Sequence, residues 1–173
     1  MFDQKPFDEA AYIERITTQS CFICEILAGR LPHHLIYQDD VAVAFLNKYT
    51  SLYGYVLVAP VSHREAVTGD FSLDDYLALQ RVVYHVAEAV RQTVPTERVY
   101  VLSLGSQQAN AHVHWHIAPL PPGVPFEKQQ YAALINQGRI LDIPDDEMAA
   151  LAARLRATLD RLSAREENDH GEV

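Results

Sequence analysis

Short runs of branched and aromatic apolar residues, separated by polar turns, recur along the first two thirds of the chain and are typical of β-strands. Three strands are predicted at Leu35–Gln38, Val41–Leu46 and Tyr55–Ala59, with a tight turn at Asp39-Asp40 between the first two. Two more are predicted at Val99–Leu104 and Ala111–Ala118, before the proline-rich stretch Pro119–Pro125 ends the sheet. The pattern predicts an antiparallel meander.

Other parts of the chain show helical periodicity, with apolar residues three or four positions apart. Residues 8–17 and Cys21–Ala28 are predicted as short helices, the second ending at Gly29. A capping sequence at Ser72 opens a long helix with an apolar face that runs to about Val94. An acidic first turn after Pro144 opens the last helix, whose inner side holds Met148, Leu151, Leu155, Leu159 and Leu162. Strands followed by helices packed on one face make an α+β domain.

The same pattern divides the chain into a central domain with flanking extensions. Residues 1–20 form an N-terminal helical extension and residues 21–125 the central domain. Residues 126–164 form a C-terminal helical extension packed on that domain, and the polar tail 165–173 is expected to be disordered. A chain of 173 residues is long enough to bury one substantial core.

Charge and hydropathy exclude several classes of protein. The formal net charge of −9 argues against a nucleic-acid-binding protein and against one that binds membranes through a basic surface. No apolar run approaches the length of a membrane span, and the opening residues Met1–Lys5 lack the apolar core of a signal peptide. We therefore expect a cytoplasmic protein. A small anionic ligand remains compatible with an acidic chain, because histidines and backbone N–H groups bind phosphate locally.

The most informative stretch is His112–Ile117, in which three imidazoles alternate with apolar residues. Alternate side chains of a strand share one face, so the three histidines are expected to point the same way while Val113, Trp115 and Ile117 enter the core. On an ordinary amphipathic strand, Ser, Thr, Lys and Glu fill such outward positions more often. Histidine is a nucleophile, a general base and a metal ligand. The row therefore predicts phosphoryl chemistry or a metal site.

This row resembles the motif of the histidine triad (HIT) family, in which three histidines alternate with hydrophobic residues. The resemblance extends to Cys21–Gly29, Pro32, Asp39-Asp40, Ala44–Asn47, Gly54–Pro60 and His63, and so covers roughly residues 21–120. It implies a HIT-like fold, a five-stranded antiparallel sheet with flanking helices, and usually a homodimer. It also implies transfer or hydrolysis of a nucleotidyl group at an α-phosphate.

The resemblance also implies roles for individual residues. His114 is expected to attack the α-phosphorus and form a nucleotidyl-histidine, which water then resolves. The backbone carbonyl of His112 accepts a hydrogen bond from the other nitrogen of His114, and His116 donates to a phosphate oxygen. The nucleotide-binding residues are Ile23, Ile26, Leu31 and Phe45 around the base, Asn47 at the ribose hydroxyls and Gln108 at a phosphate. Ordinary core packing explains the four apolar residues equally well, and a turn with Lys48 explains Asn47 nearly as well.

One loop departs from the family pattern. Ala109 replaces the serine or threonine that often follows the family's glutamine, and the loop 105–110 is shorter than the glycine-rich loop of the familiar branches. Other side chains are then expected to recognise the leaving group. The candidates are Ser103, Ser106, Gln107 and Asn110, and the sequence does not choose among them.

The two cysteines of the chain, Cys21 and Cys24, lie on one side of a helical turn, where they can chelate Zn²⁺. A buried thiol pair or a disulfide is the alternative. A tetrahedral zinc needs two further nitrogen or sulfur ligands. In zinc-containing HIT proteins and their galactose-1-phosphate uridylyltransferase relatives, these ligands resemble His63 and His112. The resemblance implies a closed, structural zinc site that clamps the N-terminal segment to the strand carrying His114.

Three classes of function follow. The favoured one is a hydrolase or transferase that acts on nucleoside phosphoramidates or dinucleoside polyphosphates, with a small nucleotide and a second copy of the chain as partners. The alternative is a catalytically weak nucleotide-binding or zinc-stabilised interaction protein. The third is an open catalytic zinc site held by His112, His114 and His116, which the nearby Cys21 and Cys24 disfavour.

Overall fold

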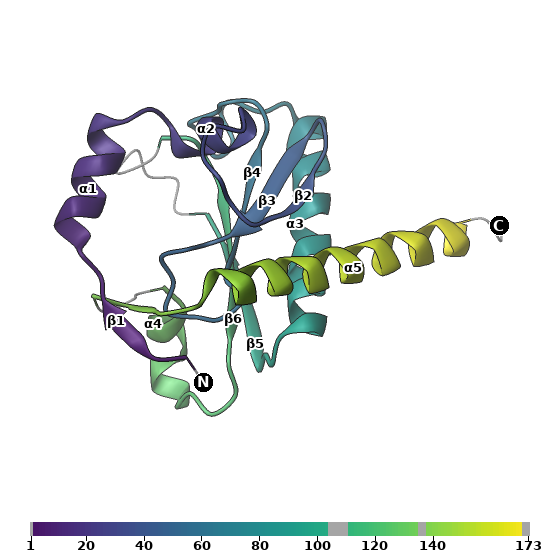
Figure 1. Ribbon diagram of the computed structural model, residues 1–173. Coiled ribbons are helices and arrows are strands. Elements are labelled where there is room, and N and C mark those ends of the chain that lie inside the picture. The colour runs from purple at the N-terminus through teal and green to yellow at the C-terminus, as the bar shows by residue number, and fades with distance from the viewer. Residues whose placement is uncertain (1, 104–110, 135–137, 171–173) are drawn as a thin grey trace.

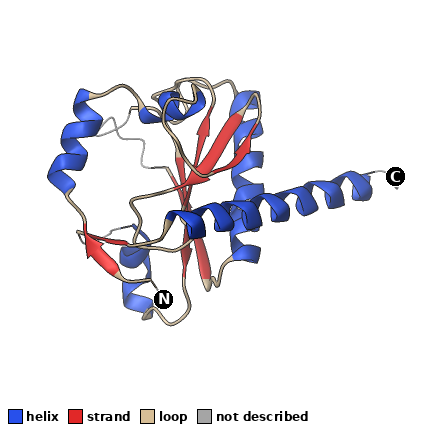
Figure 2. Cartoon of the chain, in the orientation of Figure 1, coloured by secondary structure: helices blue, strands red, loops and turns tan. Residues whose placement is uncertain are grey.

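The computed structural model describes residues 2–103, 111–134 and 138–170, without side-chain detail at residues 16 and 166–170. Figure 1 shows a central sheet with helices around it, and Figure 2 shows its strands in red. The sheet has five antiparallel strands in the order β2-β3-β4-β6-β5. They are β2 (Leu35–Gln38), β3 (Ala42–Leu46), β4 (Val56–Pro60), β5 (Arg98–Leu102) and β6 (Trp115–Leu120). The predicted five-stranded antiparallel sheet is confirmed.

Side chains alternate between the two faces of the sheet, and both faces are covered. Ala42, Ala44 and Leu46 of β3 join the larger core, together with Val56 and Val58 of β4. The intervening residues of the same strands, Val43, Phe45, Leu57 and Ala59, join a second core on the opposite face. Because β3 and β4 are buried on both faces, they contain apolar runs in place of a polar alternation.

Two long helices cover the face of the larger core. Helix α3 (Leu73–Thr93) begins at Ser72, whose side chain accepts a hydrogen bond from the backbone N–H of Asp75. Helix α5 (Asp145–His170) packs against α3, β2 and β3, and its C-terminal part extends away from the rest of the chain (Figure 1). No helix among the described residues is long and apolar enough to span a bilayer.

The short helix α2 (Phe22–Leu27) covers the opposite face with Ile23 and Ile26, so the helices do not all pack on one face as the sequence predicts. The N-terminal extension holds β1 (Gln4–Pro6) and α1 (Glu9–Thr18). Strand β1 pairs with β7 (Arg139–Leu141) in a separate two-stranded sheet that the sequence analysis missed. A 3₁₀ turn (Phe126–Lys128) and α4 (Gln129–Leu134) connect β6 to β7.

The predicted ends of the sheet and of the last helix differ from the structure. The sequence predicts that the sheet ends before Pro119, whereas β6 continues to Leu120. The carbonyl of Leu120 accepts a hydrogen bond from the N–H of Glu97, on the β5 side of β6. The backbone groups of neighbouring strand residues point to opposite sides, so Pro119, which has no N–H, faces the β4 side. On that side the pairing with β4 ends at Ile117. The sequence also predicts a disordered tail from Arg165, whereas α5 continues to His170.

Candidate active site and metal cluster

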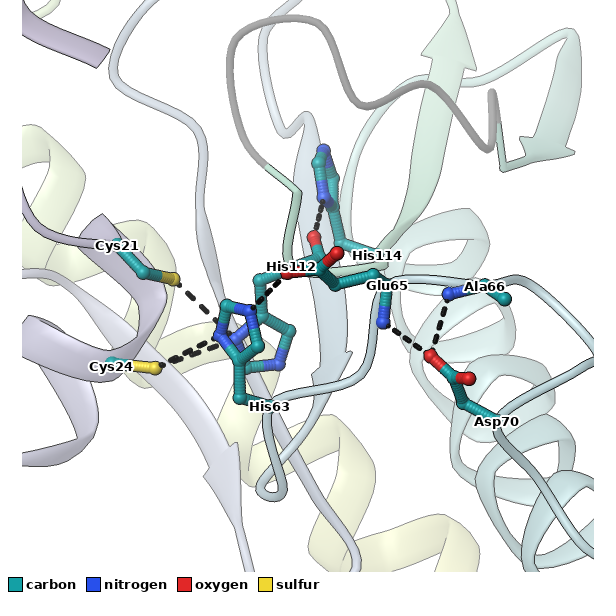
Figure 3. A network of polar contacts seen from close by, with 8 residues as sticks. All are labelled: Cys21, Cys24, His63, Glu65, Ala66, Asp70, His112 and His114. Atoms are coloured by element: carbon teal, nitrogen blue, oxygen red, sulfur yellow. Dashed lines mark hydrogen bonds and ion pairs between the residues drawn. The ribbon is translucent and has the colours of Figure 1, made fainter. Parts of the chain in front are cut away.

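Four potential metal ligands from three separate segments meet on the α2 face of the sheet (Figure 3). Cys21 and Cys24 lie at the start of α2, His63 follows β4, and His112 lies at a bend before β6. Their ligand atoms are all within 4.8 Å of one another. The structure therefore brings together the four residues that the resemblance implies.

The separations within this cluster fit a tetrahedral zinc ion. Nδ1 of His112 lies 3.5 Å from Sγ of Cys21 and 3.6 Å from Sγ of Cys24. Nδ1 of His63 lies 3.4 Å from Sγ of Cys24. Tetrahedral bonds of about 2.3 Å to sulfur and about 2.05 Å to nitrogen place such ligands about 3.6 Å apart. Two cysteines and two histidines are also a common ligand set of structural zinc sites.

Hydrogen bonds to the other ring nitrogens orient both histidines for metal binding. Nε2 of His112 donates to the carbonyl oxygen of Pro60 at 2.9 Å, which leaves the lone pair on Nδ1. Nε2 of His63 lies 3.3 Å from the carboxylate of Glu65. Metal-bound histidines usually make such contacts to a carbonyl or a carboxylate. Burial lowers the pKa of the fully buried His112 to about 4, so the imidazole stays neutral.

The loop that carries His63 is held by a carboxylate (Figure 3). Asp70 accepts hydrogen bonds from the backbone N–H groups of Glu65 and Ala66, each at 2.8 Å. The carbonyl oxygen of Arg64 accepts a 2.7 Å hydrogen bond from the N–H of Val113. The His63 loop and the triad are therefore joined through the backbone as well as through the cluster.

The hydrogen bonds of His114 define its protonation. Nδ1 of His114 donates to the carbonyl oxygen of His112 at 2.8 Å, because a carbonyl only accepts (Figure 3). The lone pair of His114 therefore lies on Nε2. Burial lowers the pKa of His114 below its ordinary value of 6.5, so the neutral, nucleophilic form predominates at pH 7.

His116 lies beside His114, with their ring centres 4.8 Å apart. Its Nδ1 is 3.0 Å from the phenol oxygen of Tyr55. Burial lowers the pKa of His116 to about 3, so this imidazole is also neutral. A neutral imidazole has one N–H to donate and one lone pair.

The three histidines do not share one strand face as the sequence predicts. Only His116 lies on β6, because the strand begins at Trp115 and not at Ala111. The chain bends at His112, whose side chain enters the metal cluster. The apolar partners behave as predicted, since Val113, Trp115 and Ile117 are buried in the larger core.

The residues predicted around the base lie together in the second core. Phe45 and Ile26 are buried there, Leu31 packs against them at the edge, and Ile23 has no exposed surface. Ile23, Ile26 and Phe45 are core residues in this conformation. Leu31 is partly exposed and is therefore the most accessible of the four to a ligand. Gln108 lies outside the described residues, as do Ser106, Gln107, Ala109 and Asn110.

Asn47 directly follows β3 and forms a turn. Its side-chain oxygen accepts a 3.0 Å hydrogen bond from the N–H of Tyr49, and its own N–H donates to the carbonyl of Tyr55. The interpretation of Asn47 as a turn residue is therefore correct, and its side-chain oxygen is engaged within the chain.

Sequence reasoning missed three residues that support the site, namely Tyr55, Glu65 and Asp70. Tyr55 alternates with Leu57 and Ala59, which indicates that it shares their sheet face. The carboxylates of Glu65 and Asp70 stand in a loop, where no periodic pattern indicates their partners.

Comparison with known proteins agrees with this geometry. Residues 28–122 match the model of the HIT domain. The chain belongs to the HIT family. It is 31% identical over 106 residues to the protein hit of Bacillus subtilis, covering 58% of this chain and 71% of that protein. It is 27% identical over 130 residues to an adenosine 5'-monophosphoramidase of Schizosaccharomyces pombe, covering 66% of this chain and 92% of the other.

The fold also matches solved HIT structures. A zinc-bound histidine triad family protein of Mycobacterium smegmatis superimposes with a TM-score of 0.65 at 22% identity. The match covers 84% of this HIT protein and 97% of the other chain. At this identity the likeness establishes the shared fold alone.

Proposed function

We propose that this HIT protein hydrolyses or transfers nucleotidyl groups through a covalent intermediate on His114. The observation that carries the proposal is the hydrogen bond from Nδ1 of His114 to the carbonyl of His112, 2.8 Å long. It leaves the Nε2 lone pair available on a neutral imidazole, as nucleophilic attack requires. His116 stands next to it as a second neutral imidazole.

The reaction proceeds in two displacements. Nε2 of His114 forms a bond to the α-phosphorus of a nucleotide conjugate. The bond from phosphorus to the leaving group breaks, and the leaving group keeps the electron pair and takes up a proton from solvent. Water then attacks the same phosphorus, loses one proton to solvent, and breaks the bond to Nε2, which releases the nucleoside monophosphate and returns the lone pair to His114. An N–H of His116 donates to a phosphate oxygen and stabilises the charge that develops in each transition state.

The residues of the metal cluster would hold one zinc ion with a structural role. Cys24 lies in α2 and Cys21 directly precedes that helix, and His112 carries the carbonyl that orients His114. When bound, zinc would have four protein ligands and no open position, and it would favour the thiolate forms of both cysteines. Such a site fixes the position of the His112 backbone and thereby supports the nucleophile.

Nucleotide binding is assigned to the α2 face next to the triad. Leu31, which packs against the core that contains Phe45, offers partly exposed apolar surface for the base, and the amide nitrogen of Asn47 contacts a ribose hydroxyl. Gln108 contacts a phosphate.

A homodimer is part of the proposal, because the exposed side of α3 carries Leu73 and Leu77, which are 72% and 54% exposed in the single chain. A cytoplasmic location stays a prediction.

A substrate panel tests the proposed activity. Adenosine phosphoramidate, adenylated lysine and dinucleoside polyphosphates are incubated with the wild-type protein and with His114→Ala, and release of the nucleoside monophosphate is measured. We expect turnover of at least one conjugate by the wild type and none by the variant. Nucleotide binding without turnover of any conjugate would instead support the catalytically weak binding protein.

A further inference from the structure

We propose that Tyr55 is a positioning residue for His116, whose tautomer it fixes by donating its phenol hydrogen to Nδ1. The proton of His116 is then on Nε2, the ring nitrogen that points away from Tyr55. The inference rests on the proposed function for its catalytic consequence. Its structural part, the tautomer of His116, is independent of any activity.

The contact between the two side chains is direct and well oriented. The phenol oxygen of Tyr55 is 3.0 Å from Nδ1 of His116. The two rings meet edge to face, with centres 5.8 Å apart and planes at 83°. Tyr55 directly precedes β4, and Leu57 of that strand is the register partner of His116 on β6. Both side chains therefore belong to the sheet face that carries the site.

The hydrogen-bond donors and acceptors of Tyr55 and His116 determine which ring nitrogen of His116 carries the proton. If Nδ1 of His116 carried the hydrogen, it would donate to the phenol oxygen, and the Tyr55 hydroxyl would need another acceptor. Within the described part of the chain, that hydroxyl has no other hydrogen-bond partner. Donation from Tyr55 to Nδ1 satisfies both groups. Burial raises the pKa of Tyr55 to about 12, so the phenol keeps its hydrogen over the working pH range.

Tyr55 is itself held on both sides. Its carbonyl accepts a 2.9 Å hydrogen bond from the N–H of Asn47. Its ring packs against the second core and against a small cluster that contains Leu52 and Ala118. A side chain restrained in this way orients His116 without reorganisation during the reaction.

The test combines kinetics with nitrogen NMR on Tyr55→Phe, which removes the hydroxyl and keeps the ring. We expect kcat to fall about tenfold, as for the loss of one positioning hydrogen bond, with KM changed less than about twofold. In the wild type, ¹⁵N shifts should show a lone pair at Nδ1 of His116 and a hydrogen at Nε2. In the variant, the two tautomers should mix.

Tyr53→Phe is the matched control. The Tyr53 hydroxyl contacts Glu147 and accepts from Arg154, and its ring packs on the opposite core, so its loss should leave kcat and the His116 tautomer unchanged. A hydrogen on Nδ1 of His116 in the wild type would overturn the proposal whatever the variant does. So would unchanged kcat and tautomer in Tyr55→Phe. Absence of turnover in the wild type with the expected tautomer would contradict the proposed function and leave the tautomer assignment standing.

Discussion

Removal of zinc is expected to detach the segment Cys21–Gly29 from the sheet while the core between the sheet and α3 stays folded. Ordering these nine residues costs about 13 kcal/mol at about 1.5 kcal/mol each. Burial of Ile23 and Ile26 contributes about 5 kcal/mol, so the segment is unstable alone by about 8 kcal/mol. A structural zinc contributes about 10–16 kcal/mol. At the middle of that range, loss of the metal lowers the free energy of unfolding by about 5 kcal/mol and Tm by roughly 10–20 °C.

Three measurements check this expectation. Protein purified without chelator should contain about one zinc per chain by elemental analysis. Calorimetry with and without chelator gives the change in Tm, and hydrogen exchange should show loss of protection confined to residues 21–29. Cys24→Ser is the matched control, because chelator should not lower its Tm further. Protein without metal, or a Tm and protection pattern that chelator leaves unchanged, would refute the reasoning.

Three further outcomes are expected. His116→Ala should lower kcat by roughly 10²- to 10³-fold in steady-state assays, as for loss of one charge-stabilising donor, and a normal kcat would remove His116 from the mechanism. Because burial lowers the pKa of His114, the neutral nucleophile is lost only as the pH falls below 6.5, so the acid limb of kcat/KM should lie below that value. An acid limb above pH 6.5 would contradict this assignment. Sedimentation at micromolar concentration should give twice the chain mass of 19.5 kDa, and a species of 19.5 kDa would contradict the homodimer.

The sheet could be predicted from the sequence because its strands leave a local signature. Apolar runs separated by turns marked β2, β3 and β4, and the alternation of Val113, Trp115 and Ile117 identified the buried side of the triad stretch. The site residues were then assigned from the HIT resemblance. The pairing of β1 with β7 could not be predicted, because Lys5 and Ile140 lie far apart in the sequence and neither strand has a distinctive pattern.

The same limit explains the error at His112. An alternating pattern is identical whether the chain is already in the strand or bends just before it. Tertiary partners of His112, among them the carbonyl of Pro60 and the thiols of Cys21 and Cys24, draw its side chain into the cluster. The hydrogen bond from Tyr55 to His116 likewise depends on the register of β4 against β6, which the sequence does not contain.

Trapping the covalent intermediate tests the central claim most directly. Rapid quenching during turnover of a labelled adenylate substrate should yield an acid-labile, base-stable phosphoramidate on the peptide that contains His114. His114→Ala should give no label and should lose roughly 10⁶-fold in kcat, as for removal of a catalytic nucleophile. Label on another residue, or near-normal turnover by His114→Ala, would contradict the mechanism.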